Sequence, residues 1–238
     1  MPTEFVSTAG RLSGRVYAQV KQRILDGHYK PGDRIPIDEL AVEFRSSKQP
    51  VREAVRTLAA DGLLDIQPQI GTIVAEYSRA EFVMFYRVLA GYEGAAAEAA
   101  AQNCRPEDAR AIRALLDREV EGAQLRRANR EFHTRVHQLA NSRLISIQSQ
   151  RMWDLSDFLL GSLPEMNQVR EGAVRQHKDH GAIVDALEAQ DSARAGKLMT
   201  AHVRALAGRI GGGPRAGRGR PAPAPGAGGH SGPGGARG

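Results

Sequence analysis

Apolar residues recur at helical spacing through most of this chain, and a short stretch ending near residue 76 breaks that pattern. Within it, two apolar runs rich in β-forming residues flank the tripeptide QPQ, which predicts a small hairpin. The segments before the hairpin have apolar positions three and four residues apart, which is typical of amphipathic helices. We expect helices at residues 12–26, 37–44 and 47–60, and strands at 63–66 and 70–75.

After residue 79 the chain has helical patterns only, so the predicted fold class is mostly α. The N-terminal helices and hairpin predict a winged helix-turn-helix, and the later helices an all-helical bundle. These later helices are expected at residues 80–103, 106–122, 125–140, 143–161, 165–189 and 191–209. The predicted domains are a flexible arm (1–10), a DNA-binding domain (11–76), a helical effector-binding and dimerisation domain (79–210) and a disordered Gly/Pro/Arg tail (211–238).

Targeting signals are not evident in the sequence. No apolar run approaches the roughly 18 residues that would cross a bilayer. The first residues lack a basic stretch followed by an apolar one, and the single cysteine, Cys104, has no partner for an internal disulfide. We therefore expect a cytoplasmic protein without a membrane partner.

The net charge of +6 does not by itself indicate binding to nucleic acid, because most of it lies in the tail. Residues 1–76 hold ten basic and ten acidic side chains, and residues 77–210 hold 19 and 17. Residues 211–238 hold four arginines and no acid. Affinity for DNA must therefore come from the local placement of charge.

The predicted helix at residues 47–60 has such a placement. Lys48, Arg52 and Arg56 are four residues apart and share one face, while an apolar stripe lies opposite. In a helix-turn-helix the start of the second helix enters the major groove, where Arg and Lys can contact guanine and Gln49 can contact adenine. Ser47 is the predicted N-cap of this helix, and its hydroxyl favours a phosphate oxygen. The alternative is a solvated charged face.

Two positions outside that helix extend the candidate DNA surface. Arg34 lies in the preceding turn and could contact the phosphate backbone. Gly71 lies in the predicted hairpin and leaves room for close approach to DNA.

Three histidines in the second half of the chain form a candidate metal site. His133, His180 and His202 each lie on a predicted helix with apolar neighbours, so each faces inward. The 22 residues between the last two, with a turn at Gln190, would bring both side chains to the same level. Imidazoles on facing helices can bind Zn, Ni, Fe or Mn. The alternative is a set of core histidines with ordinary hydrogen bonds.

The N-terminal motifs resemble those of the GntR family of transcriptional regulators. YKPGDRI, SSKQPVREAVRTLAADGLL and PQIGTIV follow one another with natural spacing over about 60 residues. The resemblance implies DNA contacts from Arg34, Ser47, Lys48, Gln49, Arg52 and the wing tip at Gly71. Many family members carry Arg before the wing glycine, whereas this chain has Ile70.

The C-terminal half resembles the FCD effector domain found in one branch of that family. FHTRVHQLANSRLI and HGAIVDALEAQDSARAGKLMTAHV carry the resemblance. It implies a divalent metal bound by Asn129, His133, His180 and His202, with Asn129 where Asp is usual. Many members also grip a carboxylate effector with an Arg four residues before the position of Glu93. Here that position is Leu89, and Arg87 is the nearest candidate.

Together these features predict a homodimeric regulator that binds an operator in double-stranded DNA and responds to a small-molecule effector of the organic-acid class. His137 is expected to be a structural or pocket residue. One alternative is a non-specific nucleoid protein, favoured only by the Arg/Gly tail. A second is a metal-dependent enzyme, which we disfavour because no acidic residue lies at a motif spacing from the histidines and because enzymes rarely carry a winged helix-turn-helix.

Overall fold

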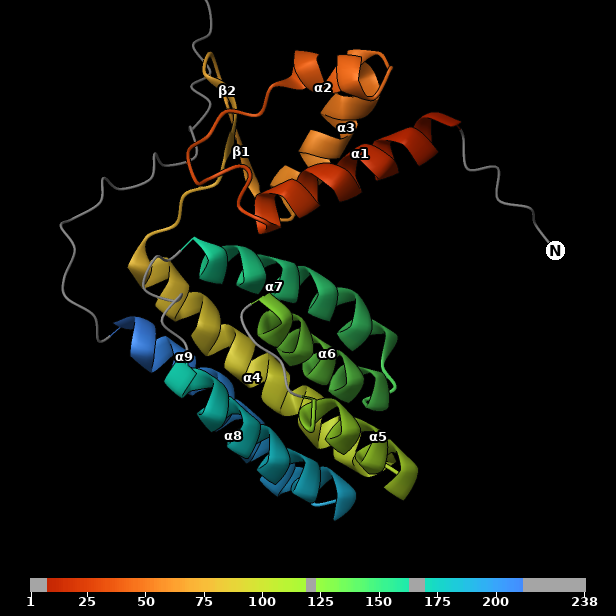
Figure 1. The fold of residues 1–238 in the computed structure, drawn as a ribbon, viewed down its shortest axis with the longest axis vertical. Helices are drawn as coiled ribbons and strands as arrows, with labels where there is room; N and C mark the ends of the chain where they lie inside the picture. The colour runs from red at the N-terminus through yellow and green to blue at the C-terminus, as the bar shows by residue number, and fades with distance from the viewer. Residues whose placement is uncertain (1–7, 119–122, 163–169, 212–238) are drawn as a thin grey trace, which may run out of the picture.

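The computed structural model describes residues 8–118, 123–162 and 170–211, and within them the N-terminal part folds as three helices and a hairpin (Figure 1). The hairpin is antiparallel and pairs Leu64 with Val74 and Gln67 with Gly71. The predicted winged helix-turn-helix is therefore confirmed. Its elements are α1 (Thr8–Leu25), α2 (Ile37–Glu43), α3 (Lys48–Ala60), β1 (Leu64–Gln67) and β2 (Gly71–Val74).

The apolar stripes of these helices form the core of this domain. Val16 and Val20 of α1, Leu40 of α2, and Val51 and Leu58 of α3 are all almost fully buried. Burial of a side chain of this size stabilises the fold by about 1.5–3 kcal/mol. Because the stripes face one another, the opposite face of α3 is left toward solvent.

The second part of the chain is a helical domain built around two helices that pack closely. A Cβ atom added to Gly94 of α4 would lie 2.1 Å from Thr200 Oγ1 of α9, and one added to Gly196 of α9 would lie 2.3 Å from Glu98 Cγ of α4. Glycine at both positions lets the helices approach. The helices are α4 (Arg79–Asn103), α5 (Pro106–Leu116), α6 (Ala123–Leu139), α7 (Arg143–Gly161), α8 (Arg170–Glu188) and α9 (Ser192–Gly211).

Several helix ends differ from the predicted ones. Helix α1 begins at Thr8 and not at Leu12, so residues 8–10 of the expected arm are helical. Helix α5 ends at Leu116, earlier than the expected residue 122. The rest of the arm and residues 212–238 of the expected tail lie outside the described residues. None of the described helices has the length and apolar character needed to cross a membrane.

Helix α7 lies where the two parts of the chain meet (Figure 1). It packs against α1 on one side and against α4 and α6 on the other. A change in the helical domain that moves α7 would therefore alter the contacts of α7 with α1 in the N-terminal domain.

Candidate nucleic-acid interface and metal centre

The polar face of α3 is accessible, as its sequence predicted. Arg52 and Arg56 are exposed, and neither has a hydrogen bond or ion pair to any residue that the structure describes. The buried Val51 and Val55 fix the other side of the helix in the core. The two guanidinium groups are therefore available to a groove without breaking internal contacts.

The start of α3 carries weaker internal contacts. Lys48 Nζ lies 2.9 Å from Asp38 Oδ2, but both side chains are largely exposed, and Gln49 Nε2 donates to Glu53 Oε1 at 3.3 Å. Surface pairs of this kind contribute about 0–1 kcal/mol, so a phosphate or a base edge can replace them. Ser47 occupies the N-cap position as predicted, although its hydroxyl makes no capping hydrogen bond.

The fold brings Arg34 to the wing. Arg34 forms a β-bridge with Ile73, and a Cβ atom added to Gly71 would lie 3.1 Å from Arg34 Nη2. Gly71 has φ of +104°, a conformation that favours glycine. At the tip, the Ile70 side chain is 55% exposed. The positive charge at the wing therefore comes from Arg34, and the tip itself is uncharged.

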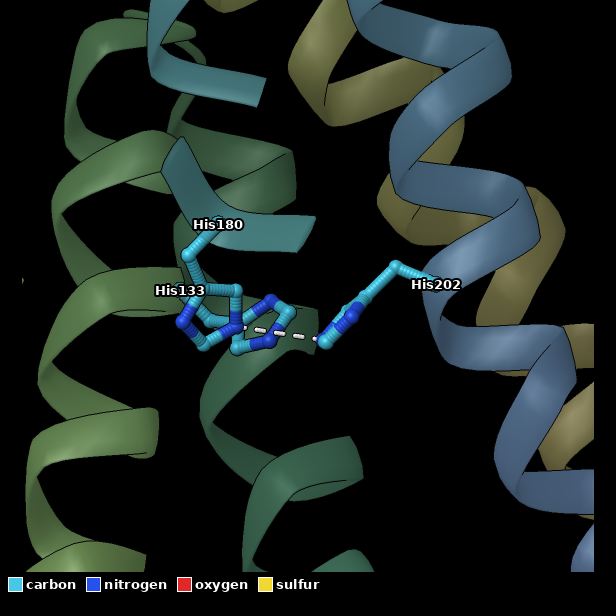
Figure 2. A group of neighbouring side chains, drawn as sticks. All are labelled: His133, His180 and His202. Atoms are coloured by element: carbon cyan, nitrogen blue, oxygen red, sulfur yellow. Dashed lines mark hydrogen bonds between the residues drawn. The ribbon is translucent and has the colours of Figure 1, made fainter. Parts of the chain in front are cut away.

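The three histidines converge from α6, α8 and α9 (Figure 2). The candidate ligand nitrogens of His133, His180 and His202 all lie within 4.8 Å of one another. His180 Nε2 and His202 Nε2 are 3.1 Å apart. His180 and His202 thus lie at the same level, as their spacing of 22 residues predicted, and His133 joins them from α6.

A buried carboxylate beside the histidines was missed by the sequence analysis. Glu93 of α4 is fully buried and accepts hydrogen bonds of 2.8 Å from His133 Nδ1, His137 Nε2 and Trp153 Nε1. The sequence analysis found no acidic residue at a motif spacing from the histidines, and the fold brings this one beside them from a helix 40 residues away in sequence. One signal existed: Glu93 falls at helical spacing among Leu89, Ala90 and Ala97, on the apolar face of α4.

His137 is held inside the protein by two partners. Its Nε2 is hydrogen-bonded to Glu93 Oε1, and its Nδ1 forms a short hydrogen bond with the Ser149 hydroxyl. Both ring nitrogens are thus engaged in the core. This agrees with a structural residue and not with a metal ligand.

The hydrogen bonding of the cluster fits a metal site. Because His133 Nδ1 donates to Glu93, its Nε2 carries the lone pair, and this buried atom has no hydrogen-bond partner. His202 Nδ1 lies 3.3 Å from Asp179 Oδ2, so its Nε2 is also oriented toward the cluster. Metal-binding histidines commonly donate their second nitrogen to a carboxylate in this way.

The protonation states fit as well. Burial, with a further contribution from nearby His133, lowers the pKa of His202 to about 4, so its imidazole is neutral at pH 7 and can bind a metal. Burial by itself would raise the pKa of Glu93, but His133 and His137 outweigh it and hold this pKa at about 2. The site therefore combines a neutral His202 imidazole with an ionised carboxylate at Glu93.

A small cavity of about 40 Å³ adjoins the cluster and is lined by Asn129, His133 and His202, among other residues. It can hold an ion or a very few water molecules, whereas pockets for organic ligands are about 300–1,000 Å³.

Leu89 lines this cavity at the position where the family resemblance would place an Arg. Arg87 is exposed and does not line the cavity, because it lies on the outer face of α4, so the structure does not bring this predicted effector residue to the site. Arg209 of α9 is the arginine at the cavity.

These features define a class of protein: a winged helix-turn-helix DNA-binding protein joined to an all-helical domain with an internal polar site. Comparison with protein families identifies it further. Residues 12–74 match the bacterial regulatory proteins of the gntR family, and residues 85–205 match the FCD domain. The chain therefore belongs to the GntR family and carries an FCD domain, and its relatives are transcriptional regulators and not enzymes.

Curated relatives support this membership. A protein of Paenarthrobacter nicotinovorans described as a probable D-xylose utilization operon transcriptional repressor is 29% identical over 83% of this chain and 88% of its own length. The Escherichia coli transcriptional repressor RspR is 26% identical over 81% and 86%. The regulator YdhC of Bacillus subtilis is 27% identical, but this chain spans only 66% of its length.

Solved structures share the fold. Escherichia coli McbR/YncC aligns with a TM-score of 0.65 and 20% identity, covering 84% of this chain and 96% of that one. A GntR regulator from Rhodococcus sp. RHA1 aligns with a TM-score of 0.61 and 21% identity, covering 85% and 99%. The fold is thus shared at low sequence identity.

Proposed function

We propose that this protein is a transcriptional repressor whose affinity for its operator is set by a small ligand bound beside a divalent metal in the helical domain. The metal part rests on one observation: the buried His133 Nε2 has no hydrogen-bond partner, and His133 lies in a cluster with His180 and His202, whose Nε2 atoms are 3.1 Å apart. The exposed face of α3 supports the DNA part. Two relatives are named as repressors, which supports repression over activation.

His133, His180 and His202 would hold the metal, and the Asn129 carbonyl oxygen would be the fourth ligand. Three imidazoles suit Zn, Ni, Fe or Mn. Asn129 adds no negative charge, so we expect weaker binding than at a site with Asp in this position. The metal would supply a positive charge that attracts an anionic effector.

A carboxylate ligand would need a second cation, and Arg209 is placed for this role. It lines the cavity together with His202, whereas Arg87 does not. An arginine can grip both oxygens of a carboxylate. Because the cavity is small, an organic acid would enter only if the surrounding helices move apart. Such movement is what a regulatory ligand needs in order to alter the rest of the protein.

We further propose a homodimer that forms through the outer face of α4. Met84 and Val88 are 57% and 60% exposed, and Gly91 and Ala95 continue the same face along the helix. A second copy would cover this stripe.

Val88→Glu is then expected to shift the protein to monomers in analytical ultracentrifugation. Ala111→Glu, at an exposed position on α5, should leave the dimer intact, and a stable dimer of Val88→Glu would contradict the proposed interface.

A single measurement tests the helical-domain part of the proposal: native mass spectrometry of freshly purified full-length protein, which reports the oligomer, the metal and any retained ligand together. We expect a dimer with one divalent metal per subunit. A metal-free protein that also fails to take up added Zn²⁺ or Ni²⁺ would contradict the metal site. It would leave the assignment to DNA binding unaffected.

Glu93→Gln should weaken metal binding without removing a ligand. The neutral amide no longer attracts the His133 Nδ1 proton as a carboxylate does, so the Nε2 lone pair becomes less basic and less well oriented. Loss of such a partner typically costs 10- to 100-fold in metal affinity, about 1.4–2.8 kcal/mol. Isothermal titration with Zn²⁺ measures this effect, and Glu98→Gln on the exposed side of α4 is the control.

A further inference from the structure

Two ion pairs join α7 to the N-terminal domain. Lys21 Nζ of α1 lies 2.8 Å from Asp154 Oδ2, and Arg151 Nε lies 3.4 Å from Asp61 Oδ1. Asp61 is the C-cap residue of α3, the helix that carries the proposed DNA contacts. The position of α3 relative to the helical domain is therefore held by charged groups one turn apart on α7.

The carboxylates of these pairs are not ordinary surface groups. The side chains of Asp154 and Asp61 are only 8% and 6% exposed, and that of Lys21 is 16% exposed. Each carboxylate has a second partner: Arg130 Nη2 lies 2.6 Å from Asp154 Oδ1, and Tyr17 donates to Asp61 Oδ2 at 2.8 Å. The Arg151 side chain is 63% exposed, whereas the carboxylates are buried. Buried carboxylates need well-formed geometry, so they favour one arrangement of the two domains over nearby alternatives.

The opposite side of α7 touches the histidine site. Trp153, next to Asp154, donates to Glu93, and its ring centroid lies 4.3 Å from that of His133. Arg130, which shares Asp154 with Lys21, lies on α6 between Asn129 and His133. The same short stretch of α7 thus contacts both the site and the N-terminal domain.

We propose that Arg151 and Asp154 are positioning residues that couple the histidine site to the DNA-binding helix. This inference rests on the proposed function and adds the route of its regulation. A ligand or metal that shifts α6 or Trp153 displaces Asp154, because Asp154 is bonded to Arg130 and adjoins Trp153. Lys21 and Asp61 then move with α7, and the recognition helix changes its placement. By linkage, DNA binding must alter the histidine site through the same contacts.

Trp153 makes this reciprocity measurable, because it is the single tryptophan of the sequence and is buried at the histidine site. A DNA duplex selected by the wild-type protein from a random pool is titrated into the full-length protein while Trp153 emission is followed. We expect the emission to change as the wild-type protein binds. In the double variant Lys21→Met/Arg151→Met the duplex should still bind in a mobility-shift assay, and the emission change should be lost.

These substitutions are chosen so that no buried carboxylate is left without a partner. Asp154 keeps Arg130, and Asp61 keeps Tyr17. Arg113→Met is the matched control, because it removes pairs to Asp185 and Glu188 that link α5 to α8, away from the domain interface. This control should keep the full emission change.

Two results would overturn the coupling route: an unchanged Trp153 emission when the wild-type protein binds the duplex, or a full emission change in the double variant. A second arm separates this inference from the proposed function. We expect Zn²⁺ to shift the wild-type dissociation constant for the duplex by about 5- to 150-fold, the usual range for coupled sites, and to shift that of the double variant much less. If Zn²⁺ does not change the wild-type dissociation constant for the duplex, metal regulation is rejected. If in that case Trp153 emission still changes when the wild-type protein binds the duplex and does not change in the double variant, the coupling route is supported.

Discussion

Replacing Arg52 with alanine is expected to abolish sequence-specific DNA binding while leaving the fold intact. The Arg52 side chain is exposed and has no partner among the described residues, so its loss costs no internal contact. A bidentate contact from arginine to guanine is worth about 1–3 kcal/mol. Two copies in the proposed dimer would double this to about 2–6 kcal/mol, which corresponds to a loss of about 30-fold or more.

The measurement is a binding isotherm with the selected duplex at physiological salt, compared with a scrambled duplex. Arg110→Ala, an exposed arginine on α5 with no described partner, controls for the loss of one positive charge. Full affinity of Arg52→Ala for the selected duplex would refute the assignment of α3 as the recognition helix. Equal affinity of the wild-type protein for both duplexes would instead favour the alternative of a non-specific nucleoid protein.

His202→Ala is expected to have the largest effect on the metal site. It removes one of three imidazoles, so the loss in metal affinity should exceed the 10- to 100-fold typical for an outer partner, reaching at least about 100-fold. His202 is less buried than His133 and His180, and its replacement leaves Asp179 partly exposed to water, so folding should tolerate the change. Isothermal titration with Zn²⁺ gives the affinity directly.

Thermal unfolding provides an independent readout of the same variant. A metal at 100 times its dissociation constant stabilises the folded state by about 2.7 kcal/mol, and this gain should disappear in His202→Ala. His28→Ala removes an exposed histidine in the N-terminal domain and should behave as the wild type. Equal stabilisation of His202→Ala by Zn²⁺ would place the metal elsewhere.

Local patterns were sufficient for most of the secondary structure and for the face of α3. Helical spacing in Lys48, Arg52 and Arg56 depends only on the chain being a helix, so it survives any arrangement of the domains. Helix ends were less predictable, as α1 and α5 show, because the first and last turns are decided by weak capping contacts. The predicted domain boundaries and site residues remain predictions.

Contacts between distant segments were predictable only in part. The histidines could be paired because one short turn separates α8 from α9, but the partnership of Glu93 with His133 spans 40 residues and depends on how α4 packs against α6. Arg87 was predicted to bind the effector because it is the arginine nearest in sequence to Leu89, where the family resemblance would place an Arg. Helical geometry turns it outward, and Arg209 of α9 lies at the cavity instead.

The sequence by itself determined the order of helices and strands, the exposed basic face of α3 and the inward direction of the histidines, because these follow from residue spacing within single elements. The tertiary structure decided which carboxylate lies behind His133, which arginine lines the cavity and which helix joins the two domains. Each of these depends on side chains from separate elements meeting at distances of a few ångströms, and the packing of whole helices sets those distances.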